Sequence, residues 1–341
     1  MRCVTRFVAL LLAAAPFGPL LPVRESAADD EAPAGSVPFP LTGTPTVRAG
    51  HVYVIDGPQV IPPNAEIHVE QRVQIVGLHN ASLEVQGGLA AHGTEAQWVV
   101  IRNVDFSPTK APQKGLHFDM VDLRGCAFKH AEGVAFDGQI TIENTCLQRD
   151  CSFDVRIATG FLRILNCEIG VPLTVATVPG TKGAPPEFSL FSTSLHDATT
   201  FSGAATTNMR ASSFGGELNA SNVSDFQLDA CTLQRPVTIT QGADDSWVKV
   251  ILQKCDVLEG ARIILVRPQG PKTKLEKVKL DKFYFGGANS QVVLDDKLIA
   301  DRIQDGADDE QVTVRAWWTK PWDRPHQLAG TMRSRVPPLA R

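Results

Sequence analysis

The sequence predicts an all-β fold, a right-handed parallel β-helix of about eleven coils, and three observations support this. A six-residue pattern with apolar first and sixth positions recurs along most of the chain. Its third position never holds a large apolar residue. Short runs of alternating apolar residues follow the copies, and aromatic residues make up only 7% of the chain. This combination is typical of many short strands joined by tight turns.

Residues 1–28 are predicted to be a cleaved export signal. Arg2 and Arg6 precede an apolar run, and small residues from Ser26 to Ala28 follow it. Proline and glycine interrupt the run before it reaches the ~20 residues that a membrane span needs. A buried N-terminal helix is the alternative. We therefore expect a mature protein that lacks a membrane span and is secreted, periplasmic or extracellular.

Residues 29–50 lack periodicity and are rich in Pro, Ala, Gly and acidic residues, so they are predicted to form a linker. The hexads then occupy residues 51–300, with spacings from 19 (Leu123 to Ile142) to 28 (Leu252 to Leu280) residues. Such units must stack at the ~4.8 Å spacing of paired strands to bury their apolar faces. The hexads begin at Ile55, Leu78, Ile101, Leu123, Ile142, Ile164, Leu190, Met209, Leu228, Leu252 and Leu280.

Position three of the hexad indicates a sharp bend between two strands. Asn and Gly tolerate the left-handed backbone that such a bend requires, and stacked Asn side chains can hydrogen-bond along the axis. The second half of the chain has Ser, Ala or Lys there instead. Position three is occupied by Gly57, Asn80, Asn103, Gly125, Asn144, Asn166, Ser192, Ala211, Ala230, Lys254 and Lys282.

With these hexads, residues 51–300 resemble the right-handed parallel β-helix proteins of the pectin-lyase-like group, in which an asparagine ladder lines one turn. The resemblance concerns the fold signature. Leucine-rich repeats have similar lengths but need further leucines that are missing here. Pentapeptide repeats share the five-residue step from Leu123 to Phe128, but that step does not continue around the coil.

Residues 301–341 are predicted to form a C-terminal cap and a disordered tail. The stretch DDKLIADRIQDGADDE is read as a short amphipathic helix or a charged loop, and QVTVRAWW as one more strand. Trp317, Trp318 and Trp322 could cover the open end of the core, which a solenoid must cap. A carbohydrate-stacking patch is the alternative for these tryptophans.

Cysteines occupy position four of four hexads, at Cys126, Cys167, Cys231 and Cys255. Small thiols suit a crowded interior column, so we expect buried thiols. Disulfides between Cys231 and Cys255, or between Cys146 and Cys151, are the alternative in an exported chain. No CxxC pair or His cluster points to a bound metal, and no cofactor is expected.

The alternating runs predict a second strand face whose outward residues could carry chemistry. If the runs stack on successive coils, histidines and carboxylates of the first half form one stripe, flanked by His68 and Glu70. Such a stripe suits acid–base catalysis or a Ca²⁺ ion held by oxygen atoms. The candidate catalytic residues are His92, His117, Asp119, Asp137, Asp154 and Arg156.

Two functions remain open at this point, and whether the protein is an enzyme is undecided. A net charge of −4 gives no electrostatic footprint for nucleic acid. The first hypothesis is an exported, non-catalytic β-helix that binds glycan or another surface component, or serves as a structural module. The second, implied by the resemblance, is a lyase or glycoside hydrolase acting on acidic polysaccharide. Asp244-Asp245 and Asp295-Asp296 match the paired aspartates of polygalacturonases, without that family's other motifs.

Overall fold

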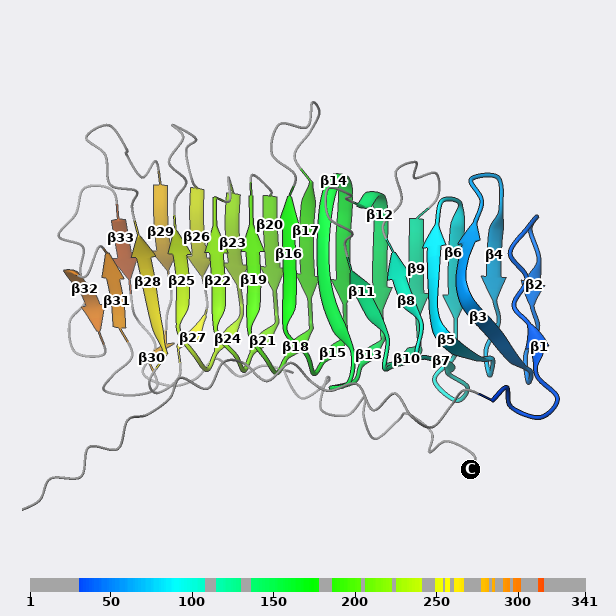
Figure 1. Cartoon of the computed structure of the whole chain (residues 1–341). Helices are drawn as coiled ribbons and strands as arrows, with labels where there is room; N and C mark the ends of the chain where they lie inside the picture. The colour runs from blue at the N-terminus through cyan, green and yellow to red at the C-terminus, as the bar shows by residue number, and fades with distance from the viewer. Residues whose placement is uncertain are drawn as a thin grey trace, which may run out of the picture.

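The chain folds into an all-β parallel solenoid, as the hexads predicted. Its strands stack side by side along one axis (Figure 1). Every pairing between named strands is parallel except β31 with β32. The computed structural model describes residues 31–107, 115–129, 136–177, 186–203, 206–222, 225–240, 249–253, 255–257, 261–266, 277–281, 284–285, 291–294, 297–301 and 312–315. Within these ranges there is no helix, and none therefore that could span a membrane.

Each coil contributes strands to three faces, which we call faces I, II and III in chain order. Face I is one column of parallel strands, and the last part of β14 belongs to it. Its strands are β2 (Thr46–Val47), β4 (Glu66–Val69), β6 (Gly88–His92), β9 (Gly115–Asp119), β12 (Phe136–Glu143), β14 (Ser152–Leu165), β17 (Glu187–Phe191), β20 (Thr206–Arg210), β23 (Asp225–Asp229), β26 (Lys249–Gln253), β29 (Lys277–Asp281) and β33 (Val312–Arg315).

Face II is built mostly from two- to four-residue strands. The first parts of β3 and β5 belong to it. Its strands are β1 (Val37–Pro38), β3 (Val52–Ile61), β5 (Gln74–Val85), β7 (Val99–Arg102), β10 (Val121–Arg124), β13 (Cys146–Leu147), β15 (Glu168–Ile169), β18 (Ser194–Leu195), β21 (Ser213–Phe214), β24 (Thr232–Leu233), β27 (Asp256–Val257) and β30 (Tyr284–Phe285).

Face III completes each coil and ends in one antiparallel strand. The last parts of β3 and β5 and the first part of β14 belong to it. Its other strands are β8 (Asp105–Ser107), β11 (Ala127–Lys129), β16 (Leu173–Thr177), β19 (Thr199–Ser202), β22 (Leu218–Ser221), β25 (Val237–Thr240), β28 (Arg262–Val266), β31 (Gln291–Leu294) and β32 (Lys297–Asp301).

Most of the described hexad residues line one shared core, as predicted. Val60 and Leu78 do not belong to it, and Ile101 pairs with Ile75 instead of Leu78. Ile101, Leu123 and Ile142 are 1%, 0% and 0% exposed and belong to the same buried cluster. The sixth positions add large side chains to this cluster, among them Phe106 and Phe128, whose rings stack with centroids 5.0 Å apart. Burying these positions removes apolar surface from water in every coil, which is the main stabilisation a solenoid has.

The first hexad, IDGPQV, is out of phase with the others. Val60 is 43% exposed, whereas the next residue, Ile61, is fully buried. The cause is an irregularity between Asp56 and Pro58, after which Val60 pairs with Glu84. About eight turns are seen, which differs slightly from the expected eleven. LQKCDV and LDKFYF each contain residues outside the described ranges.

Position three is left-handed wherever the structure describes it, which confirms the predicted bends. The φ angles lie between 46° at Asn144 and 63° at Gly57. Ser192, Ala211 and Ala230 adopt the same conformation as the asparagines, although their side chains do not favour it. The bend is therefore imposed by the stacked coils and not by the residue type alone.

The left-handed bends do not form one ladder. The early hexads bend at the edge between faces II and III, and the later hexads bend at the edge between faces I and II, which we call the change of edge. Leu123 pairs with Ile101 on one side and with Leu147 on the other, so it does not align with Ile142. Ile142 pairs instead with Phe118. Up to LRGCAF the hexads turn from face II to face III, and from IENTCL onward they turn from face I to face II.

The coil from Gly115 to Lys129 makes this change possible. Phe118, Leu123 and Phe128 are five residues apart and all fully buried, and the backbone is left-handed at both Met120 and Gly125 between them. Met120 begins the second ladder, since its N–H donates to the carbonyl of Glu143. As a result the alternating runs of the first half lie on face I and those of the second half on face III.

The two ends of the solenoid differ from the sequence-based expectations. Within the predicted linker, β1 and β2 pair with β3 and β4, and Val47 is fully buried. In the stretch expected to be helix or loop, Lys297–Asp301 is a strand that pairs antiparallel with β31. The strand expected in QVTVRAWW is present as β33. Trp317, Trp318 and Trp322 lie outside the described residues.

The six cysteines after Cys3 are all buried and present as thiols. Cys151 lies in the main core, whereas Cys146 packs with Trp98 in a separate cluster on the outer side of face II. The alternative disulfide between Cys146 and Cys151 is therefore absent, because the two side chains lie on opposite sides of one strand layer. Cys231 and Cys255 are not bonded either.

Replacing Phe128 by alanine should lower the free energy of unfolding by about 3–5 kcal/mol, the usual cost of a large cavity in a core. The ring lies between those of Phe106 and Phe153, with centroids 5.0 and 4.8 Å away. Urea unfolding followed by circular dichroism measures the change. Phe191→Ala, at a 43% exposed side chain, is the matched control and should change stability by less than about 0.5 kcal/mol.

Replacing Asn144 by alanine should cost about 2–4 kcal/mol, because it removes two side-chain hydrogen bonds and leaves alanine in a left-handed bend. Asn144→Gly removes the same bonds but tolerates the bend, so it should cost about 1 kcal/mol less. Thermal and urea denaturation of both variants separate the two contributions. Equal losses in the two variants would mean that the left-handed bend carries no strain.

Candidate functional site

Two polar regions on the outer surface result from the change of edge, and the first is a histidine–carboxylate cluster on face I. His92, Asp119 and Glu143 are laterally paired on β6, β9 and β12, so their backbones are one strand spacing apart, ~4.8 Å. His117 lies two residues before Asp119 on the same side of β9. We call these four residues the face I cluster.

The two imidazoles of the face I cluster contact each other. The rings of His92 and His117 meet edge to face with centroids 4.7 Å apart. Partial burial lowers the pKa of His92, and His117 lowers it further, whereas Asp119 and Glu143 oppose the shift and His68 adds to it. Among the described residues, no hydrogen-bond partner reaches the buried Nε2 of His117.

The second asparagine ladder ends on the carboxylate of the face I cluster. Asn166 donates from Nδ2 to Oδ1 of Asn144 over 2.6 Å, and Asn144 donates from Nδ2 to Oδ1 of Asp119 over 2.9 Å. The ladder thus fixes the orientation of Asp119, as a second layer of hydrogen bonds does for many functional carboxylates. An oriented carboxylate beside two histidines can accept or transfer a proton.

The remaining predicted site residues do not all join the face I cluster. Asp154 and Arg156 lie on the first part of β14, which belongs to face III. Asp137 is on β12 of face I, and its side chain is outside the described residues. His68 lies on β4 and aligns with Ala90 and not with His92. The single stripe expected from the alternating runs is therefore split between two faces.

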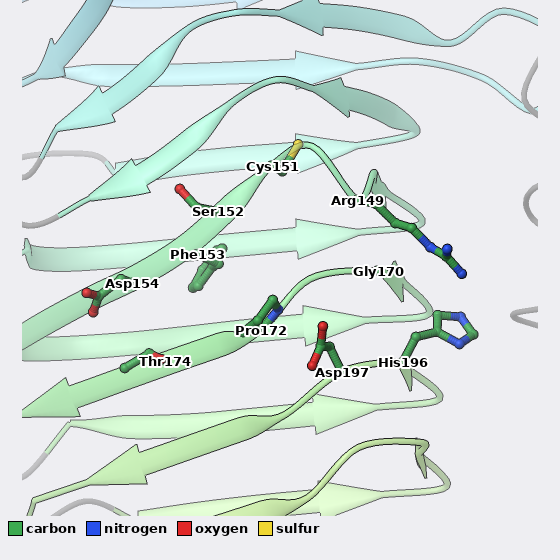
Figure 2. A pocket seen from close by; sticks show the side chains of 10 residues that line it. All are labelled: Arg149, Cys151, Ser152, Phe153, Asp154, Gly170, Pro172, Thr174, His196 and Asp197. Carbon is green, nitrogen blue, oxygen red and sulfur yellow. The ribbon is translucent and has the colours of Figure 1, made fainter. Parts of the chain in front are cut away.

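The second polar region is a groove at the edge between faces II and III, which we call the corner groove. It has a volume of about 570 Å³ and is open to solvent along one side. Figure 2 shows Arg149 and His196 at one end, and Asp154 and Thr174 on neighbouring strands at the other. Its lining residues are Arg149, Cys151, Ser152, Phe153, Asp154, Gly170, Pro172, Thr174, His196 and Asp197.

The turns between faces II and III place the charged groups of the corner groove. His196 follows β18, and its Nε2 is 3.2 Å from Oε1 of Glu168, whose side chain is 5% exposed. Asp197 accepts a hydrogen bond from the N–H of Ala198 over 2.7 Å. A Cβ on Gly216 would lie 2.2 Å from the carbonyl carbon of Asp197, so only glycine allows the next turn to approach this closely.

A line of uncharged polar side chains continues from the corner groove along face III. Thr174 pairs laterally with Thr200, Thr200 with Asn219, and Asn219 with Thr238. A parallel line two residues further along the strands consists of Ala176, Ser202, Ser221 and Thr240. All eight side chains are partly exposed. We call these two lines the hydroxyl track.

The sequence alone indicated some of these residues but not the corner groove. The alternation of apolar residues in the second-half runs predicts that Thr174, Asn219, Thr238 and Thr240 face outward, and all four side chains are partly exposed. Arg149, His196 and Asp197 gave no periodic signal, because they lie in turns of variable length. The signal that could have found them is their place one or two residues after the sixth hexad position, which is Leu147 or Leu195.

No group of three or more His, Cys, Asp or Glu side chains among the described residues is placed to hold a metal ion. Comparison with known proteins adds no family. The chain matches no protein-family model, and the searches of curated proteins and of solved structures gave no match.

The lowered pKa of His92 predicts a specific pH dependence of stability. The folded state takes up this proton at lower pH than the unfolded chain, whose histidines titrate near 6.5. The free energy of unfolding should therefore fall as the pH drops below ~6.5, and His92→Gln should reduce that fall. Urea titrations between about pH 7.5 and pH 5 measure it.

Asn208→Gln, a non-titrating change on the same face, is the control for this prediction and should keep the wild-type slope. A His92→Gln variant that follows the wild-type pH dependence throughout would show that the imidazole is not held in its neutral form by the cluster.

Proposed function

We propose that this protein is an exported, non-catalytic β-helix that binds an extended, neutral polysaccharide along the hydroxyl track. The observation that carries the proposal is the lateral register of Thr174, Thr200, Asn219 and Thr238 on four successive strands. Their hydroxyl and amide groups repeat at the ~4.8 Å strand spacing and offer both donors and acceptors. A sugar polymer presents hydroxyl groups at regular intervals and can match such a row.

Rigidity of the track favours binding of a flexible polymer. Phe201 and Ala220, which alternate with track residues on β19 and β22, are 1% exposed in the core. The backbone of the track is thus held by packing and strand pairing before any ligand arrives, so little protein entropy is lost on binding. Several weak contacts along one chain then add up to useful affinity.

The charge pattern supports a neutral ligand. From Thr174 to Thr240 the two lines of the track contain no charged side chain. Along these two lines an acidic polysaccharide would place its carboxylates beside hydroxyl groups, which gives up strong charge-assisted hydrogen bonds. The exposed Arg156, paired laterally with Ala176, offers a cation only at the first coil of the track. Arg149 and His196 in the corner groove could contact a single acidic group at one end of the chain.

Binding is tested by titrating neutral and uronic-acid polysaccharides into the purified protein by calorimetry. Thr200→Val should weaken binding of the neutral polymer about 3- to 10-fold, the value of one lost hydrogen bond. The variant keeps the shape of the side chain and does not touch the core. Thr141→Val on face I is the matched control and should bind as the wild type does. Equal losses in both variants, or affinity for none of the polymers, would contradict the proposal.

The export signal proposed for residues 1–28 places this ligand outside the cytoplasm. N-terminal sequencing of the protein recovered from its host's secreted or periplasmic fraction tests this part. A mature N-terminus after about residue 28 is expected, whereas an intact Met1 on a cytoplasmic protein would contradict it.

A second function, a polysaccharide lyase or hydrolase related to the pectin-lyase-like group, is favoured by one feature of face I. Asp119 and Glu143 lie on adjacent strands, ~4.8 Å apart along the backbone, near the ~5–5.5 Å carboxyl separation of retaining glycosidases. The His92–His117 contact adds two further proton-transfer groups. In the lyase or hydrolase function, the polysaccharide lies across face I and not along face III.

Turnover separates the two functions. The protein is incubated with uronic-acid polysaccharides, with and without Ca²⁺, and new reducing or unsaturated ends are measured. A catalytic face I would give products that disappear in Asp119→Asn and His117→Gln but persist in Thr200→Val. The binding function predicts no products at all.

A further inference from the structure

Two buried thiols lie side by side under the corner groove. Cys126 directly precedes β11 and Cys151 directly precedes β14, and these strands pair in parallel with Ala127 opposite Ser152. The N–H of Ser152 donates to the carbonyl of Cys126 over 2.9 Å. The two cysteines therefore occupy the same lateral position in adjacent coils, one residue before the ladder begins.

This register sets a backbone separation that a disulfide can span. Laterally paired residues in adjacent parallel strands are ~4.7–4.9 Å apart, and bonded cysteines have Cα atoms ~4.4–6.8 Å apart. No change of backbone register is therefore needed to join Cys126 to Cys151.

The two thiols also point in the same direction. Cys126 Sγ contacts the carbonyl oxygen of Ile101 at 3.4 Å, and Cys151 Sγ contacts that of Leu123 at 3.2 Å. Ile101 and Leu123 are themselves laterally paired, so the thiols make equivalent contacts one coil apart. Side chains with equivalent contacts on adjacent strands run alongside each other and do not diverge.

Access distinguishes this pair from the other cysteines. Cys151 lines the corner groove, as Figure 2 shows, and is 6% exposed. Cys231 and Cys255 are in equivalent register through Thr232 and Asp256, but both are fully buried. A small reagent can approach Cys151 from the groove, whereas neither member of the second pair has such an approach among the described residues.

We propose that Cys126 and Cys151 form a redox-active pair that a small-molecule disulfide of the glutathione class converts into a disulfide between two coils. The sulfur of Cys151, after losing its proton, attacks one sulfur of the oxidant and releases the first reduced thiol. The sulfur of Cys126, likewise deprotonated, then attacks Cys151 Sγ and releases the second. The two cysteine protons end on the two released thiols, and the oxidant gains the two electrons that the cysteines lose.

Burial makes the reaction slow in the native state. It raises the pKa of Cys126 to about 12 and raises that of Cys151 further, and only the thiolate is a nucleophile. The bond should therefore form over hours at neutral pH, and faster in alkaline buffer or during folding. Once formed, it joins adjacent coils beneath the turn that carries Arg149.

Peptide mapping of the whole mature chain tests the proposal. The protein is incubated with oxidised or reduced glutathione, alkylated, digested without reductant and analysed by mass spectrometry. A linked peptide containing Cys126 and Cys151, lighter by two hydrogen atoms, should form only under oxidation and before any Cys231–Cys255 link. Both cysteines alkylated under all conditions, a Cys146–Cys151 link, or earlier formation of the Cys231–Cys255 link would overturn it.

Two variants test the order of events. Cys126→Ser should accumulate a glutathione adduct on Cys151, whereas Cys151→Ser should give no linked peptide and a much slower adduct on Cys126. Oxidation should raise the thermal midpoint of the wild type, reversibly with reductant, and leave that of Cys151→Ser unchanged. If the adduct on Cys126 in the Cys151→Ser variant formed faster than the adduct on Cys151 in the Cys126→Ser variant, entry of the oxidant through the corner groove would be contradicted. The wild-type map remains decisive if either variant fails to fold.

Discussion

The left-handed residue at each hexad bend is the constraint on which the rest of the structure depends. It turns the chain sharply enough for the next strand to pair with its equivalent in the adjacent coil. Non-glycine residues pay ~1–2 kcal/mol for this conformation, and Ser192, Ala211 and Ala230 adopt it nonetheless. Stacking offsets that cost, because each correct bend brings a further apolar pair into the common core.

The hexads were sufficient to predict the fold class, since burial and backbone conformation both follow from local residue types. They were not sufficient to predict which edge each bend occupies. The bend at Met120 lies between the buried residues Phe118 and Leu123, and the bend at Gly125 lies between Leu123 and Phe128. Both pairs are five residues apart, so the sequence pattern alone allows Leu123 to align with Ile142 or with Leu147. Lateral hydrogen bonds select Leu147, and that choice moves Asp154 and Arg156 away from His92.

The change of edge also explains why the protein has two polar regions with different chemistry. On face I the second asparagine ladder ends at Asp119, beside His92 and His117, where charged and titratable groups collect. On face III the register lines up hydroxyl groups over several coils without charge. The corner groove was not predictable, because the turns at Arg149 and His196 are 47 residues apart and come together only when the coils are stacked in register.

The most direct test of this account is a methyl NMR titration of threonine-labelled protein with the neutral polysaccharide that binds best. Threonine methyl groups report on both faces at once, since Thr174, Thr200 and Thr238 lie on face III and Thr141 lies on face I beside His117. The account predicts saturable shifts that are confined to the face III threonines. Shifts centred on Thr141, with the face III methyl signals unchanged, would contradict it.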